Sequence, residues 1–195
     1  MSCAKADSHF ILRTGPYKGD KVCVEGPEYE MAGASSNMGC FTPEFVMEFN
    51  FYCDTYGIDT LSSATCLAFV MECYEAGVIT KEHTGGLDLK FGAEPEAMEI
   101  LHQMARGEGF GVDVGQGIRW LKNKWIKEYG IDEKFVQDIG MEVKGLEYSE
   151  YVPKESLAQQ AGYAMANKGP QHDEAWLIFM DKVNNQLPSF EDKAE

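Results

Sequence analysis

The sequence has no pair of cysteines at C-x2-C spacing, no apolar run near 20 residues and no surplus of basic residues. The first absence removes the usual signature of a self-contained zinc or iron–sulfur site. The second argues against a membrane anchor, because a membrane-spanning helix needs roughly 20 apolar residues. The third argues against nucleic acid as a partner, since a net charge of −15 repels phosphate backbones.

The composition is that of a globular chain from a reducing compartment. Hydrophobic residues make up 44% of the 195 residues, which is too many for a disordered chain and enough for a substantial core. The six cysteines are irregularly spaced, and the N-terminus has no basic region followed by a long apolar stretch. We therefore expect reduced thiols and a cytoplasmic location.

The hydrophobic spacing predicts a mainly α fold with a short N-terminal β-hairpin. Two strand-like stretches, 9–15 and 21–30, flank turn-forming residues. A helix is predicted from Thr42-Pro43 to Gly57, and a second one, capped by Ser62 or Ser63, ends at Gly77. Further helices are predicted at 95–106, 118–129, 156–169 and 173–186.

Residues 140–155 mark a change in composition, because the helix signals there give way to a loop. We place a domain boundary within this stretch. It divides the chain into residues 1–143 and residues 144–195.

The turn between the first two predicted helices, residues 54–60, has a pattern suited to ligand binding. Gly57 permits a left-handed backbone, and the carboxylates of Asp54 and Asp59 accept hydrogen bonds from NH-rich heterocycles. Thr60 and the serines after it present backbone donors at a helix N-terminus. The alternative is an ordinary helical turn whose aspartates only cap helices.

Three other features carry side chains suited to chemistry. The stretch EGPEYE, residues 25–30, brings Glu28 and Glu30 together, and close carboxylates raise one another's pKa. His172 follows a predicted helix end and is suited to proton transfer. Cys66 lies one turn into a helix, where the dipole would favour its thiolate. The alternatives are a solvated turn, a structural histidine and a buried apolar thiol.

Taken in order, EGPEYE, YGIDTLSSATCLAFVMECYEAGVI, GLDLKFG, VKGLE and GYAMANKGPQH resemble the tungsten-containing aldehyde ferredoxin oxidoreductase family over nearly the whole chain. The resemblance implies a partial middle domain at 1–143 and the start of the C-terminal domain at 144–195. It also implies two tungstopterin or molybdopterin ligands around one metal, beside a 4Fe-4S cluster.

The resemblance assigns roles to particular residues. Asp54-Thr-Tyr-Gly57-Ile58-Asp59 matches the family's pterin-binding signature Asp-x-x-Gly-Leu-Asp with Ile58 in place of Leu. The residues expected to bind pterin are Asp54, Gly57, Ile58, Asp59 and Thr60. The family's active-site glutamate corresponds to Glu28 or Glu30, and its active-site histidine to His172. Cys3 corresponds to the last cysteine of the cluster motif.

The sequence also departs from the family pattern. It lacks the family's N-terminal β-rich domain, the other cluster cysteines and the second pterin signature. We therefore expect an internal fragment that is inactive alone.

The intact enzyme is expected to oxidise an aldehyde to a carboxylic acid and to pass electrons through the cluster to ferredoxin or another low-potential carrier, with a homodimer left open. One rival is the tungsten subunit of a class II benzoyl-CoA reductase, which acts on an aromatic acyl-CoA and in which Cys66 would ligate tungsten. The other is a non-enzymatic helical binding module.

Overall fold

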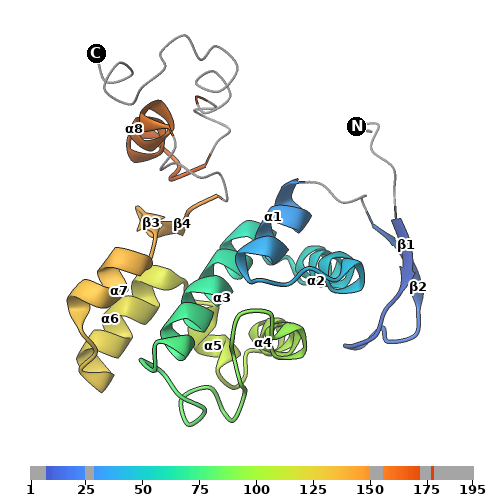
Figure 1. Cartoon of the computed structure of the whole chain (residues 1–195). Helices are drawn as coiled ribbons and strands as arrows, with labels where there is room; N and C mark the ends of the chain where they lie inside the picture. Colours follow the sequence, from blue (N-terminus) through green and yellow to red (C-terminus); the bar gives the residue numbers. More distant parts are fainter. Residues whose placement is uncertain (1–7, 25–28, 150–155, 172–176, 178–195) are drawn as a thin grey trace.

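The computed structural model describes residues 8–24, 29–149, 156–171 and 177, and it confirms a mainly helical fold with an N-terminal hairpin (Figure 1). Two antiparallel hairpins pair β1 (Ser8–Ile11) with β2 (Lys21–Val24) and β3 (Glu142–Val143) with β4 (Leu146–Glu147). The helices are α1 (Tyr29–Asn37), α2 (Pro43–Tyr56), α3 (Thr60–Glu75), α4 (Glu94–Arg106), α5 (Gly111–Val114), α6 (Ile118–Tyr129), α7 (Glu133–Ile139) and α8 (Leu157–Met165). Within these ranges, no helix has the length and apolarity that a bilayer crossing requires.

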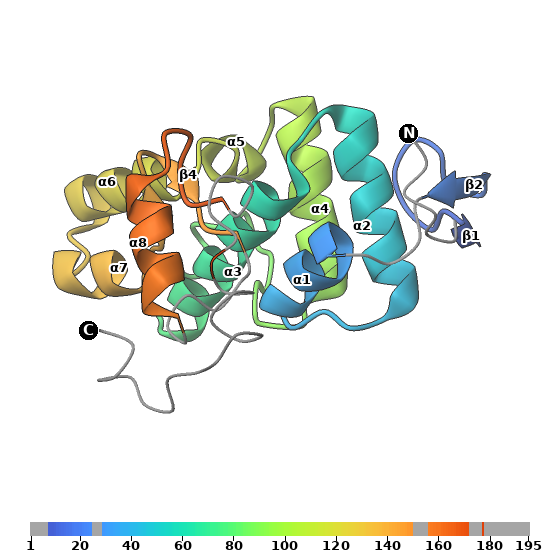
Figure 2. The ribbon, with the colours of Figure 1, turned by 90° about the horizontal axis from the view of Figure 1, so that it is seen from above.

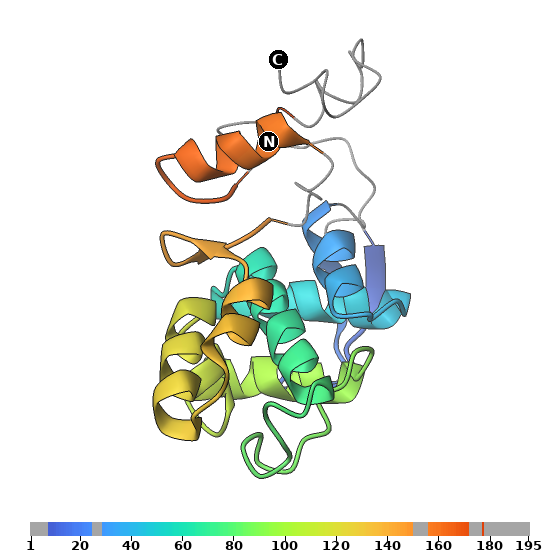
Figure 3. The same cartoon turned by 60° about the vertical axis from the view of Figure 1, so that its left-hand side comes forward.

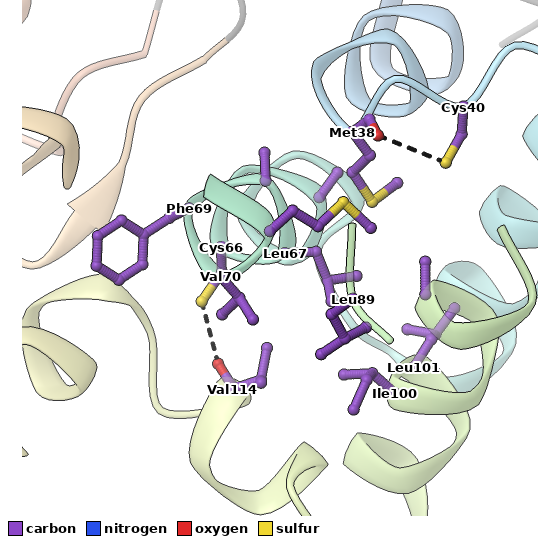
Figure 4. Close-up of a cluster of buried hydrophobic side chains, with 14 of the residues drawn as sticks. Met38, Cys40, Cys66, Leu67, Phe69, Val70, Leu89, Ile100, Leu101 and Val114 are labelled. Atoms are coloured by element: carbon purple, nitrogen blue, oxygen red, sulfur yellow. Dashed lines mark hydrogen bonds between the residues drawn. The ribbon is translucent and has the colours of Figure 1, made fainter. Parts of the chain in front are cut away.

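Helix α3 lies at the centre of the helical body. Viewed from above, α1, α2 and α4 lie on one side of it and α6 and α7 on the other (Figure 2). Buried side chains surround α3 because its sequence is apolar or small on nearly every face. Leu67 lies beside Leu89 on the side toward α4, whereas Val70 lies on the side toward Val114 of α5 (Figure 4). This enclosure fixes the position of the first turn of α3.

The turn that joins α2 to α3 is formed by local sequence signals. Gly57 ends α2 with a φ of 69°, a left-handed conformation that favours glycine. Asp59 then caps α3, and its Oδ1 accepts a hydrogen bond of 2.7 Å from the amide of Ser62. The prediction of Ser62 or Ser63 as the cap was wrong, because Asp59 is the last extended residue and Thr60 is already helical.

Helix α1 corrects the predicted strand over residues 21–30. The strand ends at Val24, and a helix has begun at Tyr29. Met31 and Ala34 of this helix are buried, and α1 packs against α3. Tertiary packing therefore decides the conformation of Glu30, which lies in the first turn of a helix and not on a strand.

Several short elements also differ from the sequence prediction. Helices α5 and α7 were not predicted, and residues 142–147 form a hairpin where a loop was expected. Helix α8 ends at Met165, earlier than the predicted 169, because Ala166 leaves the helical conformation. The helix predicted at 173–186 lies outside the described residues apart from Leu177. The boundary at 143/144 falls in the β3–β4 turn, and the division into two domains stays a prediction.

A buried carboxylate attaches the N-terminal hairpin to the helical body. The side chain of Glu48 on α2 is fully buried, and its Oε1 accepts hydrogen bonds from the amides of Arg13 (2.9 Å) and Thr14 (2.7 Å). The Thr14 hydroxyl donates to the same oxygen at 2.8 Å, and the Arg13 guanidinium pairs with Oε2 at 3.2 Å. Tyr52 of α2 donates to the Thr14 carbonyl at 2.6 Å. The segment after β1 is thereby held on α2.

His102 on α4 continues this network, and the order of donors assigns its tautomer. The Thr14 hydroxyl gives its one proton to Glu48, so it accepts from Nε2 of His102 at 3.0 Å. The ring then carries its proton on Nε2, and Nδ1 accepts from the Tyr56 hydroxyl at 2.8 Å. In a protonated ring Nδ1 would become a donor, so the Tyr56 hydroxyl would have to turn and accept instead of donating. Burial correspondingly lowers the pKa of His102.

This lowered pKa predicts a loss of stability in mild acid. Below about pH 6.5 His102 is protonated in the unfolded chain but still neutral in the folded protein. Protonation therefore stabilises the unfolded state relative to the folded state. The contribution is fully present above this pH and is lost as the pH falls toward the folded-state pKa. We expect the thermal midpoint to fall as the pH is lowered from 7.5 to 5.5, and to fall less steeply with pH in His102→Gln. An equal dependence on pH in the two proteins would contradict the assignment of this effect to His102.

Candidate cofactor-binding site

A cavity of about 870 Å³ lies where the α2–α3 turn meets the β3–β4 turn and the segment after α8. Figure 3 shows α8 and the β3–β4 hairpin on one side and the helical body with α1 and α3 on the other. Small-molecule sites commonly measure about 300–1,000 Å³. The cavity is therefore large enough for a cofactor of moderate size.

Four of the five predicted pterin residues line this cavity. They are Asp54, Ile58, Asp59 and Thr60. Gly57 does not line it, and a Cβ added there would meet no atom within 4 Å. Its contribution is the left-handed backbone that turns the chain between the two aspartates.

Asn50 holds the two ends of the turn together. Its amide nitrogen donates to Oδ2 of Asp54 at 3.4 Å, and its amide oxygen accepts from the Thr60 hydroxyl at 3.2 Å. Asn50 is buried on α2, so it fixes the last turn of α2 against the first turn of α3. Asp59 uses Oδ1 to cap α3. These three hydrogen bonds hold the turn that forms the acidic wall of the cavity.

The predicted catalytic residues are placed only in part. Glu30, in the first turn of α1, lines the same cavity as Asp54. Glu28 and His172 lie outside the described residues, as does Cys3. Gln171, the residue before His172, lines the cavity. Segments far apart in sequence that were singled out for chemistry therefore meet at one cavity.

Cys66 lies beside a second cavity of about 360 Å³, which shares Ile58, Asp59, Ser62 and Gly145 with the first. Its thiol is buried and donates to the Val114 carbonyl at 3.3 Å (Figure 4). Burial, reinforced by nearby Glu147, raises its pKa well above the ordinary value. This direction opposes the dipole-favoured thiolate expected from the sequence, because desolvation acts against the helix dipole, and the assignment of Cys66 as a metal ligand stays a prediction.

The buried cysteines predict selective thiol labelling. Burial raises the pKa of Cys40, Cys53 and Cys73 to about 12, and Cys66 shares this environment, whereas Cys23 is exposed. Among the described cysteines, we expect N-ethylmaleimide at pH 8 to modify Cys23 and to spare the other four, as measured by peptide mass spectrometry. Labelling in urea is the control, and labelling of native Cys66 would contradict its buried state.

Two lysines of the site were not singled out from the sequence. Lys144 and Lys168 line the cavity from the β3–β4 turn and from the segment after α8. Lys144 has a φ of 59° and Gly145 a φ of 84°, the pattern of a two-residue hairpin turn with positive φ at both positions. The available signal was Lys-Gly between the strand-prone residues Val143 and Leu146.

Glu142 holds this hairpin turn in place. Its carboxylate accepts from Arg119 Nη2 at 2.7 Å, from Lys122 Nζ at 3.2 Å and from the amide of Gly145 at 3.0 Å. Burial alone would raise the pKa of Glu142, but these hydrogen bonds outweigh it and keep the pKa below its usual value. The turn that carries Lys144 is therefore anchored to α6.

Within the described ranges, no group of three or more His, Cys, Asp or Glu side chains is placed to hold a metal ion. The cysteines there are separated and form no cluster of ligands. The described residues thus offer acceptors for an organic cofactor and provide no ligand set for an iron–sulfur cluster.

The fold is a helical unit with a cavity beside the α2–α3 turn, and comparison with known proteins identifies its family. The family model described as aldehyde ferredoxin oxidoreductase, domains 2 and 3, matches residues 1–195. A tungsten-containing aldehyde ferredoxin oxidoreductase of Pyrococcus horikoshii is 34% identical over 160 residues, which is 80% of this chain and 25% of the relative. An aliphatic sulfonate oxidoreductase, WOR-like subunit, of Pyrococcus furiosus is 30% identical over 175 residues, 88% of this chain and 27% of the relative.

The chain belongs to the aldehyde ferredoxin oxidoreductase family, a family of oxidoreductases. It spans about a quarter of the length of the curated relatives it matches. Its mainly helical architecture agrees with a match to domains 2 and 3 of the family.

Proposed function

We propose that this chain is part of an enzyme that oxidises an aldehyde to a carboxylic acid at a tungsten or molybdenum bis-pterin centre and passes electrons through a 4Fe-4S cluster to ferredoxin or another low-potential carrier. The observation that carries the proposal is the shared cavity. Glu30, the Asp54–Thr60 turn and Gln171 all line it, although they lie far apart in sequence.

The residues present fit one pterin. Its NH-rich ring system needs hydrogen-bond acceptors, and Asp54 and Asp59 supply them on a rigid turn. The bound metal centre supplies the electron-accepting chemistry. A second pterin and the cluster need groups beyond the described residues, and Cys3 is proposed as one cluster ligand.

The residues of this chain would bind, orient and handle protons. Aldehyde oxidation takes an oxygen from water and releases protons together with electrons. Glu30 lines the cavity on α1, so we assign it, or Glu28, to proton transfer. His172 is assigned the same kind of role. In the full-length enzyme His172→Ala is expected to keep pterin and to lose turnover.

The geometry of Cys66 bears on the rival reaction, ring reduction of an aromatic acyl-CoA by a benzoyl-CoA reductase-like enzyme. A thiol that donates to the Val114 carbonyl and has a raised pKa is suited to a structural role. We therefore expect Cys66→Ala in the full-length enzyme to retain its tungsten, as measured by plasma mass spectrometry. Loss of tungsten with the fold intact would support direct ligation and the rival.

Metal analysis of the longest natural form tests the proposal against a non-enzymatic binding module. Tungsten or molybdenum together with about four irons per chain, the content of one cubane cluster, is the expected result. Metal-free protein from cells supplied with tungsten and molybdenum would overturn the proposal.

Turnover assays separate the enzymatic alternatives. We expect aldehydes to reduce a viologen dye, and benzoyl-CoA with a low-potential donor to remain unreduced. An aliphatic sulfonate is a third substrate to assay, because one relative carries that activity in its name. Ring reduction without aldehyde oxidation would replace the proposal by its rival.

A further inference from the structure

The acidic and the basic side chains that line the cavity lie on different sides of it. Glu30, Asp54 and Asp59 lie on its helical side, on α1 and at the α2–α3 turn. Lys144 and Lys168 line it from the β3–β4 turn and from the segment after α8, which lie across from the helical body (Figure 3). In a chain with a net charge of −15, two lysines at one cavity are a local exception. A ligand that fits both sides carries donors at one end and negative charge at the other.

The two lysine-bearing segments are joined by several contacts. Lys144 donates through Nζ to the carbonyls of Ala166 and Asn167, immediately before Lys168. The amide of Ser149 donates to the Pro170 carbonyl at 3.1 Å. Both contacts connect the β3–β4 region to the segment after α8. Lys144 and Lys168 therefore lie on one continuous side of the cavity, which we call the lysine edge.

Gly169 allows the two segments to approach closely. It has a φ of 146°, and a Cβ added there would come within 2.8 Å of Cδ2 of Leu146. A side chain at this position would push the segment that carries Lys168 away from the hairpin. The glycine thus places Lys168 on the same edge as Lys144.

The backbone conformation of Lys144 also supports a ligand site at this place. It is the one non-glycine residue with positive φ within the described ranges. Asparagine, aspartate or glycine would fit this conformation with less strain. Strained conformations of this kind occur often at ligand sites. The two carbonyl oxygens that Lys144 contacts carry only partial negative charges, so they do not neutralise its ammonium group.

The N-terminus of α3 is the competing place for an anion. Asp59 already caps it, with Oδ1 2.7 Å from the amide of Ser62, so a second anion there would meet a carboxylate. Lys144 and Lys168 carry the opposite charge, so an anion is favoured beside them over the N-terminus of α3.

We infer that Lys144 and Lys168 form a binding edge for an oxyanion, a phosphate or sulfonate group of a ligand held in this cavity. The inference deepens the proposed function and rests on it for the identity of the ligand. Two sources share this chemistry: the phosphate tail of the pterin cofactor and the anionic head of a substrate.

Lysine substitutions in the full-length enzyme test the edge. Lys144→Met with Lys168→Met removes both charges, the double arginine variant keeps them, and Lys18→Met alters an exposed lysine of the β1–β2 loop as a control. Tungsten is measured by plasma mass spectrometry and pterin by the fluorescence of its oxidised form. KM is measured for sulfoacetaldehyde and for neutral propionaldehyde.

Two results support the edge and identify its source. A loss of tungsten and pterin of about tenfold or more, the effect of losing charge-assisted hydrogen bonds, assigns the edge to the cofactor phosphate. Full cofactor with a similar rise in KM for sulfoacetaldehyde alone assigns it to the substrate. Because Lys144→Met also removes the tie to Ala166, the single variant Lys168→Met must shift the same quantity.

Unchanged cofactor content and unchanged KM values in the double methionine variant would overturn the edge and leave the proposed function intact. A wild-type protein free of tungsten and pterin would overturn the proposed function instead. The edge is then tested with millimolar pyrophosphate. A rise in the thermal midpoint in wild type that is lost in the double methionine variant supports it, and no rise in wild type overturns it.

Discussion

Glu48→Ala is expected to lower the free energy of unfolding by about 3–5 kcal/mol, the range for removing one partner from a buried ionic network. The change leaves the amides of Arg13 and Thr14 and the hydroxyl of Thr14 without their shared acceptor, Oε1 of Glu48. For a chain of this size the thermal midpoint falls by roughly 10 °C. Hydrogen exchange should quicken most at these two amides, because the hairpin loses its attachment to α2.

Two variants calibrate this result. Glu48→Gln keeps the oxygen that accepts three hydrogen bonds but turns an NH2 group toward the Arg13 guanidinium, so we expect an intermediate loss. Glu44→Ala, on the exposed first turn of the same helix, is expected to change stability by less than about 0.5 kcal/mol. An alanine variant of Glu48 as stable as that of Glu44 would contradict the anchoring role.

Asp54→Ala in the full-length enzyme is expected to reduce bound pterin and tungsten about tenfold or more, since a charged acceptor contributes about 1.5–3 kcal/mol to a hydrogen bond. The fold is expected to remain intact. Asp54 is exposed in the last turn of α2, where a negative charge opposes the helix dipole, and its hydrogen bond from Asn50 is long at 3.4 Å, so alanine there is expected to cost little stability. Loss of cofactor without loss of thermal stability is therefore the diagnostic result.

Asp54→Asn is the companion variant, because the amide keeps one acceptor and the shape of the side chain. We expect it to hold more cofactor than alanine does. Glu44→Ala serves again as the matched carboxylate on the same helix. Full cofactor in Asp54→Ala would show that the turn does not cradle the pterin, whatever the enzyme's activity.

The sequence predicted those features that depend on neighbouring residues. The α2–α3 turn was predicted because Gly57 supplies a left-handed helix end and the apolar spacing on either side follows the helical period. The resemblance then assigned this turn to a pterin. The cavity beside Asp54 and Asp59 agrees with that hypothesis.

Features that depend on distant contacts could not be predicted in this way. Tyr29 and Glu30 were placed on a strand, and the packing of Met31 and its neighbours against α3 made them helical. The burial of Glu48 depends on the return of the hairpin to α2, which no local spacing reveals. The basic edge depends on contacts between the segments that carry Lys144 and Lys168.

The cavity draws its acidic wall from the α2–α3 turn and its basic edge from residues that follow β3. The residues of the acidic wall are therefore synthesised before Lys144 and Lys168. Until Gln171 has been synthesised, the growing chain lacks part of the lining of this cavity. If the proposed function holds, a cofactor can contact both sides of its cavity only after residue 171 has been synthesised.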